Sequence, residues 1–368
     1  MPNNVFENLV ARDHEQVIFC SDNSTGLKAI IAIHNTALGP ALGGCRMWNY
    51  ANEDEALKDV LRLSRGMTYK AAVAGLNLGG GKAVIIGDAK KLKSEALFRA
   101  FGRFVNGIAG RYITAEDVGT SVRDMEWVRM ETPHVTGISR SLGGSGDPSP
   151  VTAFGVYQGM RAAAKVHLGK DSLAGLTVAI QGVGHVGAYL AKHLVQDGAK
   201  VVVTDIDTEA VKRLVNDLKV EGVGPDEIYD QKCDVFAPCA LGGIVNTKTV
   251  SRLKCKVIAG AANNQLEDDD LIAPQLQEKG ILYSPDYVIN AGGLINVANE
   301  LEGYNQERAM QQAGNIYNIL MRVFQIAAEQ KVTTQQAAAT LAMERVSNVG
   351  RLKHIFTGYP GGRIRGVS

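Results

Sequence analysis

The stretch that decides the fold is TVAIQGVGHVGAYLAKHLVQ, residues 177–196. β-Branched and apolar residues predict a strand over 177–181, and the apolar spacing further on predicts a helix over 186–196. Gly198 is a typical residue just past a helix end. Between strand and helix, residues 182–187 fit the pattern G-x-G-x-x-G. A strand, a glycine turn and a helix in this order are typical of a dinucleotide-binding unit.

Each glycine of this turn has a physical role in such a unit. Gly182 permits the tight turn, Gly184 lets a pyrophosphate approach the backbone, and Gly187 lets helix and strand pack closely. The start of the helix adds unpaired N–H groups and positive potential. The alternative is a purely structural turn, which the flanking strand and helix make the weaker interpretation. The predicted cofactor-binding residues are Gly182, Val183, Gly184, His185, Val186 and Gly187.

Asp205 indicates which dinucleotide is bound. It ends the next predicted strand, 200–204, and comes 18 residues after Gly187, near the spacing of the acid that holds an adenosine ribose. A carboxylate there would repel a 2′-phosphate, so the sequence favours NAD over NADP. Arg213, on the predicted helix 209–219, could soften that preference.

Strands and helices continue to alternate after this unit. Short apolar runs at 233–237, 256–259 and 281–283 predict further strands. Such alternation predicts a parallel, doubly wound α/β sheet. The last third is helical, with an amphipathic stretch over 307–330 and a second helix through Val349 that Thr334 caps.

The first part of the chain predicts a separate α/β unit. The expected strands are 17–20, 27–34, 83–86 and 112–115; Asn52 is expected to cap a helix, and Gly79-Gly80-Gly81 to form a turn. Residues 139–150 are rich in glycine, serine and proline, which makes them the best linker candidate. The predicted domains are therefore 1–148 and 149–333, with the segment 334–368 returning to the first domain.

Composition excludes several classes of function. The 368 residues carry 39 basic and 38 acidic side chains, so no bulk charge attracts nucleic acid or an anionic membrane. No signal peptide or membrane span is expected. The five cysteines are scattered without a Cys-x-x-Cys pair, which favours a reduced, cytoplasmic protein. The seven histidines show no metal-binding spacing, so no metal site is expected.

Three charged residues of the first domain are candidates for chemistry. Lys70 lies among apolar residues, and Lys82 directly follows three glycines. An apolar setting disfavours the charged form of a lysine and lowers its pKa, which suits proton transfer at neutral pH. Asp117 follows a predicted strand, in a loop position typical of catalytic acids, although aspartates that only form turns are commoner there.

Several ordered motifs together resemble the Glu/Leu/Phe/Val amino acid dehydrogenase family, over nearly the whole chain. They are LGPALGG (38–44), GMTYK (66–70), LGGGK (78–82), TAED (114–117), the glycine turn 182–187, AANNQ (261–265) and PDYVINAGG (285–293). Length and detail are most similar to the leucine-type members. The resemblance implies reversible, NAD-dependent oxidative deamination of a branched-chain L-amino acid, leucine first, to its 2-oxo acid and ammonia.

The resemblance also implies roles for single residues. Lys82 would be the catalytic lysine and Asp117 the general base. Lys70, helped by Asn290, would bind the substrate carboxylate. Asn263 and Thr152 would contact the nicotinamide side of NAD. The side chain of the substrate would be met by Leu42, Gly43, Ala115, Thr136, Leu294 and Val297.

Substrate choice stays open at this point. The leucine at position 294 is more similar to what the phenylalanine enzymes carry there, whereas the alanine at position 115 is typical of the leucine enzymes. One methylene of pocket size gives only about 1–3 kcal/mol of discrimination, so phenylalanine dehydrogenase remains an alternative. A catalytically silent NAD-binding regulator is a remote one.

The resemblance finally implies an architecture and an assembly. Two α/β domains would flank a cleft, the first binding substrate and other subunits, the second a Rossmann-type NAD domain. Family members are homo-oligomers, and an octamer is expected.

Overall fold

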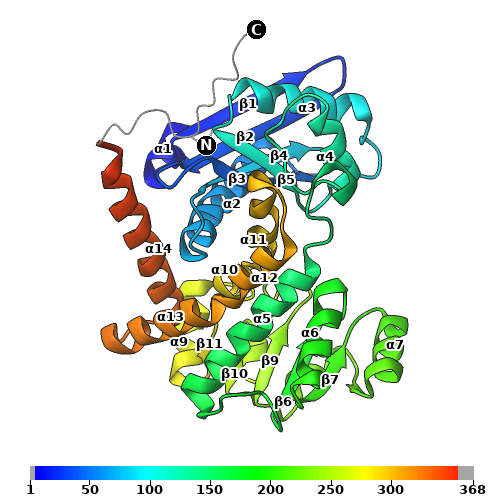
Figure 1. Cartoon of the computed structure of the whole chain (residues 1–368), viewed down its shortest axis with the longest axis vertical. Helices are drawn as coiled ribbons and strands as arrows, with labels where there is room; N and C mark the ends of the chain where they lie inside the picture. The colour runs from blue at the N-terminus through cyan, green and yellow to red at the C-terminus, as the bar shows by residue number, and fades with distance from the viewer. Residues whose placement is uncertain (1–4, 355–368) are drawn as a thin grey trace.

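In the computed structural model, which describes residues 5–354, the strands form two separate sheets (Figure 1). The second sheet is parallel throughout, in the order β11-β10-β9-β6-β7-β8. Its strands run outward in both directions from β6, which confirms the doubly wound α/β prediction. Its members are β6 (Thr177–Gln181), β7 (Lys200–Thr204), β8 (Glu221–Gly222), β9 (Val235–Pro238), β10 (Val257–Ile258) and β11 (Leu282–Tyr283).

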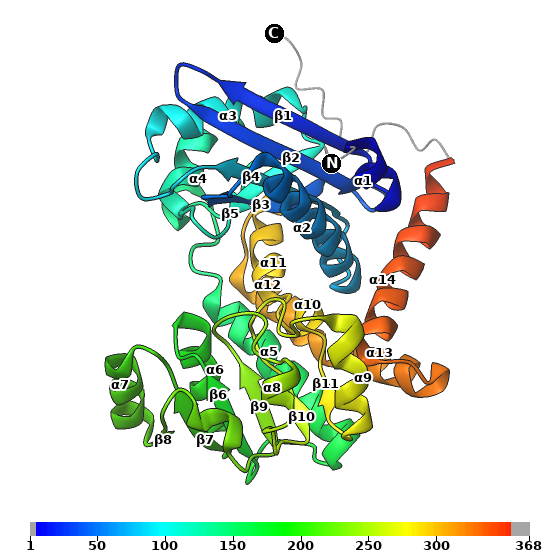
Figure 2. The ribbon, with the colours of Figure 1, turned by 180° about the vertical axis from the view of Figure 1, so that it is seen from behind.

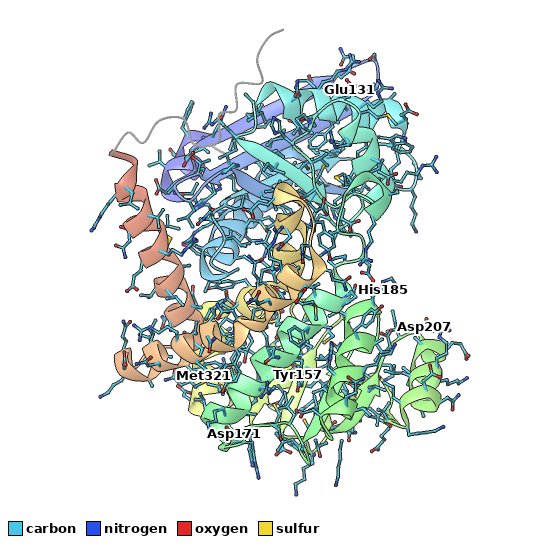
Figure 3. All side chains as sticks on the ribbon, viewed as in Figure 1. Glu131, Tyr157, Asp171, His185, Asp207 and Met321 are labelled. Carbon is cyan, nitrogen blue, oxygen red and sulfur yellow. The ribbon has the colours of Figure 1, made fainter. Side chains whose placement is uncertain are left out.

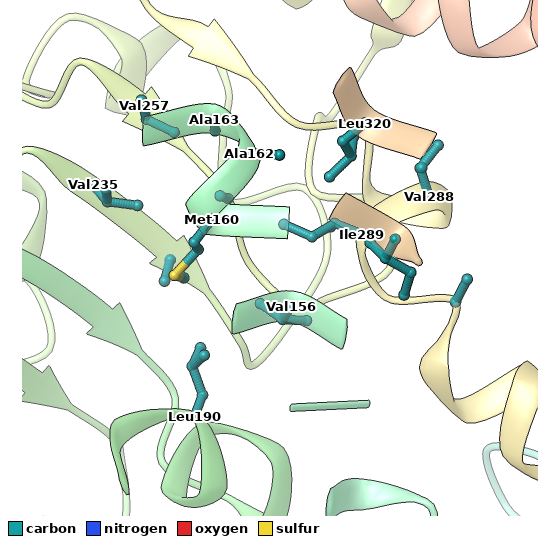
Figure 4. Packing of buried hydrophobic residues seen from close by; sticks show 14 of the residues in the cluster. Val156, Met160, Ala162, Ala163, Leu190, Val235, Val257, Val288, Ile289 and Leu320 are labelled. Carbon is teal, nitrogen blue, oxygen red and sulfur yellow. The ribbon is translucent and has the colours of Figure 1, made fainter. Parts of the chain in front are cut away.

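Helices cover both faces of this sheet because its strands are apolar on both sides. In Figure 4, Met160 of α5 (Ser149–Ala163) points between Leu190 of α6 (His185–Gln196) and Val235 of the sheet, and Val156 of α5 belongs to the same core. The other helices here are α7 (Thr208–Leu218), α8 (Thr247–Val250), α9 (Asp269–Glu278), α10 (Asp286–Ile289) and α11 (Gly292–Ala298), with η2 (Ala164–Leu168) extending α5 and η3 (Glu227–Asp230) before β9.

The first sheet is mixed, in the order β1-β2-β4-β3-β5. Strands β3, β4 and β5 pair in parallel, whereas β2 pairs antiparallel with both of its neighbours, β1 and β4. Helix α2 (Glu53–Val73) covers one face, and α3 (Glu95–Gly107) and α4 (Val122–Arg129) cover the other. Asn52 caps α2 as predicted. The remaining elements are β1 (Gln16–Asp22), β2 (Leu27–Asn35), β3 (Ala41–Trp48), β4 (Gly79–Ile86), β5 (Tyr112–Glu116), α1 (Val5–Ala11) and η1 (Arg140–Leu142).

The prediction of a turn at residues 79–81 is wrong, because these glycines begin strand β4. A Cβ atom on Gly79 would lie 2.0 Å from the Asn35 carbonyl oxygen, and one on Gly80 would lie 2.1 Å from the Thr68 backbone nitrogen. The glycines are therefore needed for close packing of β4 against β2 and α2, and not for a change of chain direction.

The long helix predicted over 307–330 is also wrong in one respect. It is two helices, α12 (Gln306–Gly314) and α13 (Ile316–Gln330), that meet at Asn315. Their apolar residues pack in different clusters. Ala313 of α12 packs with Val151, whereas Leu320 of α13 packs in the main core of the second lobe. The break lets each helix turn its apolar side to its own cluster.

The last helix, α14 (Thr334–Gly350), begins one residue earlier than predicted, since Thr333 and not Thr334 is its N-cap. Thr333 forms a capping box with Gln336, while the hydroxyl of Thr334 donates to the Tyr283 carbonyl. After α14 only η5 (Arg351–His354) is described, so residues 355–368 of the predicted returning segment lie outside the described residues.

The two lobes are joined at several places. Residues 143–148 cross from the first lobe to α5, α11 reaches back to the first lobe, and α14 lies beside α2 (Figure 2). Glu300, in η4 (Asn299–Glu302), accepts hydrogen bonds from the backbone N–H groups of Gly137 and Ser145 at 3.1 and 2.9 Å. Within residues 5–354 no helix has the length and apolar content needed to cross a membrane.

Candidate active site

The register of the first sheet places the side chains of Lys82, Arg46 and Asp117 on the face that α2 covers. Arg46 pairs with Val84 across β3 and β4, and Lys82 is two residues before Val84, so Lys82 and Arg46 point to the same side. On β5, Ala115 pairs with Gly44. Asp117 comes two residues after Ala115 and reaches that same side just past the strand end.

Lys82 and Asp117 form a close ion pair there. The distance from Lys82 Nζ to Asp117 Oδ2 is 2.9 Å, and the side chains are 6% and 23% exposed. Burial alone would raise the pKa of Asp117, but the charges and hydrogen bonds of Lys82 and Arg46 outweigh it and hold that pKa below its usual value. Asp117 is therefore ionised at neutral pH, directly beside a buried cation.

The loop after β5 fixes the backbone of Asp117. The Thr120 hydroxyl donates to the Cys45 carbonyl at 2.8 Å and accepts from the Asp117 N–H at 2.9 Å. Gly44 makes room for the aspartate, since a Cβ atom at Gly44 would lie 2.8 Å from Asp117 Cβ. The position of the carboxylate is thus set by β3 as much as by its own strand.

Arg46 and Asp59 belong to this site and were missed by sequence reasoning. Arg46 Nε donates to Asp117 Oδ2 at 3.0 Å, and its Nη1 donates to Asp59 Oδ2 on α2 at 2.9 Å. The Tyr50 hydroxyl donates to the same Asp59 oxygen at 2.7 Å. The available signal was an arginine inside a strand whose other residues are mostly apolar or glycine.

Lys70 lies near this pair on the last turn of α2. Loss of hydration lowers its pKa to about 8, while Asp286 of the second lobe opposes that shift. Its ammonium group has no hydrogen-bond or ion-pair partner among residues 5–354. Burial raises the pKa of Asp286, whose carboxylate accepts the backbone N–H of Asn264. Lys70 is thus a partly buried cation that no carboxylate among residues 5–354 contacts directly.

An apolar cluster built from both lobes holds several of the expected side-chain contacts. Leu42 of β3 and Leu294 of α11 are both buried in it, with Val297 packed against its edge. The cluster also includes Ala71, the residue after Lys70. Its other members are Leu78, Ile113, Met67, Leu76 and Ala298.

Of the remaining expected pocket residues, Gly43 lies on β3, Ala115 on β5, and Thr136 in the segment after α4. Gly43 pairs with Thr114, and a Cβ atom at Gly43 would lie 1.7 Å from the Gly81 carbonyl oxygen. Thr136 is buried and bonds to Thr114 through its backbone N–H. Ala115 is buried but lies outside the apolar cluster.

The glycine turn of the second lobe has the geometry of a phosphate cradle. Gly182 has φ +102°, and a Cβ atom there would lie 2.6 Å from Ala240 Cβ. A Cβ atom at Gly187 would lie 2.0 Å from the Gly182 carbonyl oxygen, whereas one at Gly184 would meet nothing within 4 Å. Two glycines are thus required by packing, and the third leaves open space at the start of α6. These residues fit a bound dinucleotide.

The other expected cofactor residues surround this turn. The Asp205 carboxylate accepts hydrogen bonds from the backbone N–H of Val183 at 2.7 Å and of Asp207 at 2.9 Å. These bonds stabilise the conformation of the glycine turn. His185 begins α6 with an exposed side chain, and Figure 3 shows it on the side of the second lobe that faces the first. Val186 packs partly buried against the core.

Asn290 and Asn263 contact each other. Asn290 Nδ2 donates to Asn263 Oδ1 at 2.7 Å and to the Ala261 carbonyl at 3.1 Å, while the buried Asn290 Oδ1 has no partner. Thr152 Oγ1 donates to the Pro148 carbonyl at 2.9 Å within α5. Among residues 5–354, no group of three His, Cys, Asp or Glu side chains could hold a metal ion.

Comparison with known proteins decides the family. Residues 14–134 match the Glu/Leu/Phe/Val dehydrogenase dimerisation domain, and residues 143–213 and 203–353 match the Glutamate/Leucine/Phenylalanine/Valine dehydrogenase model. The chain belongs to the Glu/Leu/Phe/Val dehydrogenase family. The resemblance drawn from the sequence motifs is thereby confirmed. As an amino acid dehydrogenase, the chain acts on a small-molecule substrate with a nicotinamide cofactor. The alternative of a catalytically silent regulator is therefore not supported.

Individual relatives of this family are similar over nearly their whole length. A leucine dehydrogenase of Thermoactinomyces intermedius is 58% identical, covering 96% of either chain, and one of Geobacillus stearothermophilus is 57% identical with the same coverage. The crystal structure of L-tryptophan dehydrogenase from Nostoc punctiforme superposes with a TM-score of 0.86 at 48% identity, covering 94% of this chain and 99% of that one.

Proposed function

We propose that this family member catalyses the reversible, NAD-dependent oxidative deamination of L-leucine, and of valine and isoleucine, to the 2-oxo acid and ammonia. The observation that carries the proposal is the placement of an unpartnered lysine and a lysine–aspartate pair near an apolar cluster that includes Ala71, the residue after Lys70. An α-amino acid with an aliphatic side chain needs these three features together. Relatives named leucine dehydrogenase are 56–58% identical, against 49–51% for tryptophan and phenylalanine dehydrogenases.

Lys70 supplies the cation for the substrate carboxylate in this proposal. Its lack of a protein partner supports the role, because a buried cation otherwise lacks compensation. Asn290 is a weaker helper than the resemblance implied. Its amide nitrogen already donates to Asn263. Its unpartnered amide oxygen can only accept a hydrogen bond, so it cannot bind the carboxylate of the substrate.

Asp117 and Lys82 carry out the proton chemistry. Asp117, ionised and partly exposed, takes a proton from the substrate ammonium so that the amine is ready for oxidation. A bound nicotinamide would supply the hydride acceptor for Cα. Lys82 then donates a hydrogen bond to the water that attacks the resulting iminium carbon. Asp117, once it has released its first proton to solvent, takes a proton from that water, returns it to the nitrogen and takes the remaining hydroxyl proton as ammonia leaves.

NAD, and not NADP, is the proposed cofactor. The fit of the glycine turn to a pyrophosphate supports a dinucleotide, with Val183, His185 and Val186 lining the start of α6. The carboxylate of Asp205 lies at the end of β7, where it would repel a 2′-phosphate. Asn263 and Thr152 are proposed to contact the nicotinamide half.

The pocket proposal places the leucine side chain against Leu42, Leu294 and Val297, with Gly43, Ala115 and Thr136 around it. Phenylalanine remains the second candidate, since Leu294 was the one departure from the leucine type. A panel of L-leucine, L-valine, L-phenylalanine and L-glutamate, each with NAD and with NADP, tests substrate and cofactor together. We expect the highest kcat/KM for leucine with NAD; a higher value for phenylalanine or for NADP would overturn that part of the proposal.

We also propose a domain division and an assembly. The first domain is 1–148 with the returning segment 334–368, and the NAD domain is 149–333; the two sheets and the packing of α14 on α2 support this. The match of residues 14–134 to a dimerisation domain supports an oligomer. An octamer is proposed, which native mass spectrometry would test. The free state of all five cysteines supports a cytoplasmic location.

A further inference from the structure

The carboxylate of Asp117 is held on one side only. Lys82 Nζ and Arg46 Nε both donate to Oδ2, at 2.9 and 3.0 Å. Oδ1 receives no hydrogen bond from any residue between 5 and 354, and the side chain remains partly exposed. The two oxygens are therefore unequal: Oδ2 is engaged by two cations, and Oδ1 is free to meet a substrate.

Arg46 is in turn bound by a carboxylate of helix α2, which covers this face of the sheet. Its Nη1 donates to Asp59 Oδ2 at 2.9 Å, and the Tyr50 hydroxyl donates to that same oxygen. One planar guanidinium thus spans two carboxylates, Asp117 beyond β5 and Asp59 on α2. A lysine has a single nitrogen on a flexible chain and could not fix both at once.

Stability alone does not account for this arrangement. Partly exposed ion pairs contribute only about 0–1 kcal/mol, and the apolar cores on both faces of the sheet already hold β3 in place. The contacts instead restrict rotation of one carboxylate. An error of about 1 Å in the position of a reacting group can cost roughly 10²-fold in rate.

We propose that Arg46, held by Asp59, is a positioning residue that fixes Asp117 through Oδ2 and leaves Oδ1 as the oxygen that takes the proton from the substrate. This inference rests on the proposed function, in which Asp117 is the base. It adds a β3–α2 contact to a site otherwise described by two lysines and one aspartate.

The same contact affects the charge state of Asp117. Arg46 is one of the two cations that outweigh the effect of burial and keep the pKa of Asp117 low. Burial raises the pKa of Tyr50, Tyr112 and Cys45, so these three stay neutral. The titratable groups that interact electrostatically with Asp117 are Lys82 of β4, Arg46 and Cys45 of β3, Tyr50 after β3, Lys70 of α2, and Tyr112 and Glu116 of β5.

Three variants separate the charge of Arg46 from its geometry. Arg46→Met removes both, so kcat should fall by about 10²-fold and the acidic limb of kcat/KM should move to higher pH. Arg46→Lys keeps the charge, so kcat should fall while the limb moves less. Asp59→Asn loosens the arginine, so kcat should fall with KM for leucine nearly unchanged. Each rate is compared with a thermal melt of the same protein.

Arg62→Met is the matched control, because Arg62 also contacts Asp59, at 3.3 Å, but does not reach Asp117. Its kcat and pH profile should match the wild type. The role of Arg46 is contradicted if all three variants keep kcat within about twofold with unchanged limbs, or if Arg62→Met loses as much. If Arg46→Met does not fold, Arg46→Lys and Asp59→Asn decide. A wild type inactive on every amino acid of the panel overturns the proposed function instead.

Discussion

At the scale of the residue, the chemistry depends on how charges are paired. Lys82 has one carboxylate partner, Asp117 has two cations, and Lys70 has no partner within the described chain. The motifs predicted these three residues because each lies in a recognisable local sequence. Arg46 and Asp59 could not be predicted in the same way, since Arg46 and Asp117 are 71 residues apart and meet only through strand pairing.

The low pKa of Lys70 gives a pH-dependent prediction. Below about pH 8 its ammonium is charged and binds a carboxylate; above about pH 8 it becomes neutral and binds weakly. We therefore expect Ki of 4-methylpentanoate, which lacks the titrating amino group, to rise above about pH 8 by up to about tenfold per pH unit. Inhibition measured against leucine at several pH values checks this.

Lys70→Arg is the control for that measurement, because an arginine stays charged across the range. Its Ki should be nearly constant with pH. A wild-type Ki that does not change with pH, or an equal rise in Lys70→Arg, would assign carboxylate binding to another group.

At the scale of the element, the second lobe was predictable because its signals are local. The strand–turn–helix at 177–196 carries both its hydrophobic pattern and its glycines within one short stretch. Strand β3 and the glycines that begin β4 were not recognised, because their glycines satisfy contacts with residues distant in sequence. The break at Asn315 was hidden for a similar reason: the two helices it separates pack on different clusters.

Two glycines of one turn should respond differently to the same change. Gly184→Ala meets no atom within 4 Å, so the protein should keep its melting temperature. The added methyl would crowd a pyrophosphate, at about 1–3 kcal/mol, so KM for NAD should rise about tenfold or more. Gly187→Ala would clash with the Gly182 carbonyl and should lower the melting temperature. Melts and NAD titrations of both variants test this, and an unchanged KM in Gly184→Ala would place the pyrophosphate elsewhere.

At the scale of the whole molecule, the chain returns to its first lobe through α14. Arg345 donates to the Leu76 carbonyl at 2.6 Å, to Asn77 Oδ1 at 2.8 Å and to the Gly75 carbonyl at 3.2 Å. These acceptors lie just past the end of α2, the helix that carries Lys70. The sequence predicted a returning helix by resemblance, but this contact needed the folded chain.

Arg345→Met should therefore destabilise the fold. Charged hydrogen bonds contribute about 1.5–3 kcal/mol each, and partial exposure reduces that, so we expect a loss of about 1–3 kcal/mol in the free energy of unfolding by urea. Arg322→Met, on the exposed side of α13 and without a partner in residues 5–354, should stay within about 0.5 kcal/mol of wild type. Equal stability of the two variants would show that α14 is held by its apolar residues alone.

At this scale the proposed reaction, NAD-dependent deamination of leucine, depends on Asp117, paired with Lys82, as its base. The most direct test is the rate of NADH formation from L-leucine by Asp117→Asn, with NADH binding followed by fluorescence in the same sample. We predict a fall in kcat of roughly 10²–10⁴-fold with NADH binding and the thermal melt unchanged, because the amide keeps the shape and loses the base. A folded, NADH-binding Asp117→Asn protein that retains kcat within about tenfold of wild type would show that Asp117 is not the base.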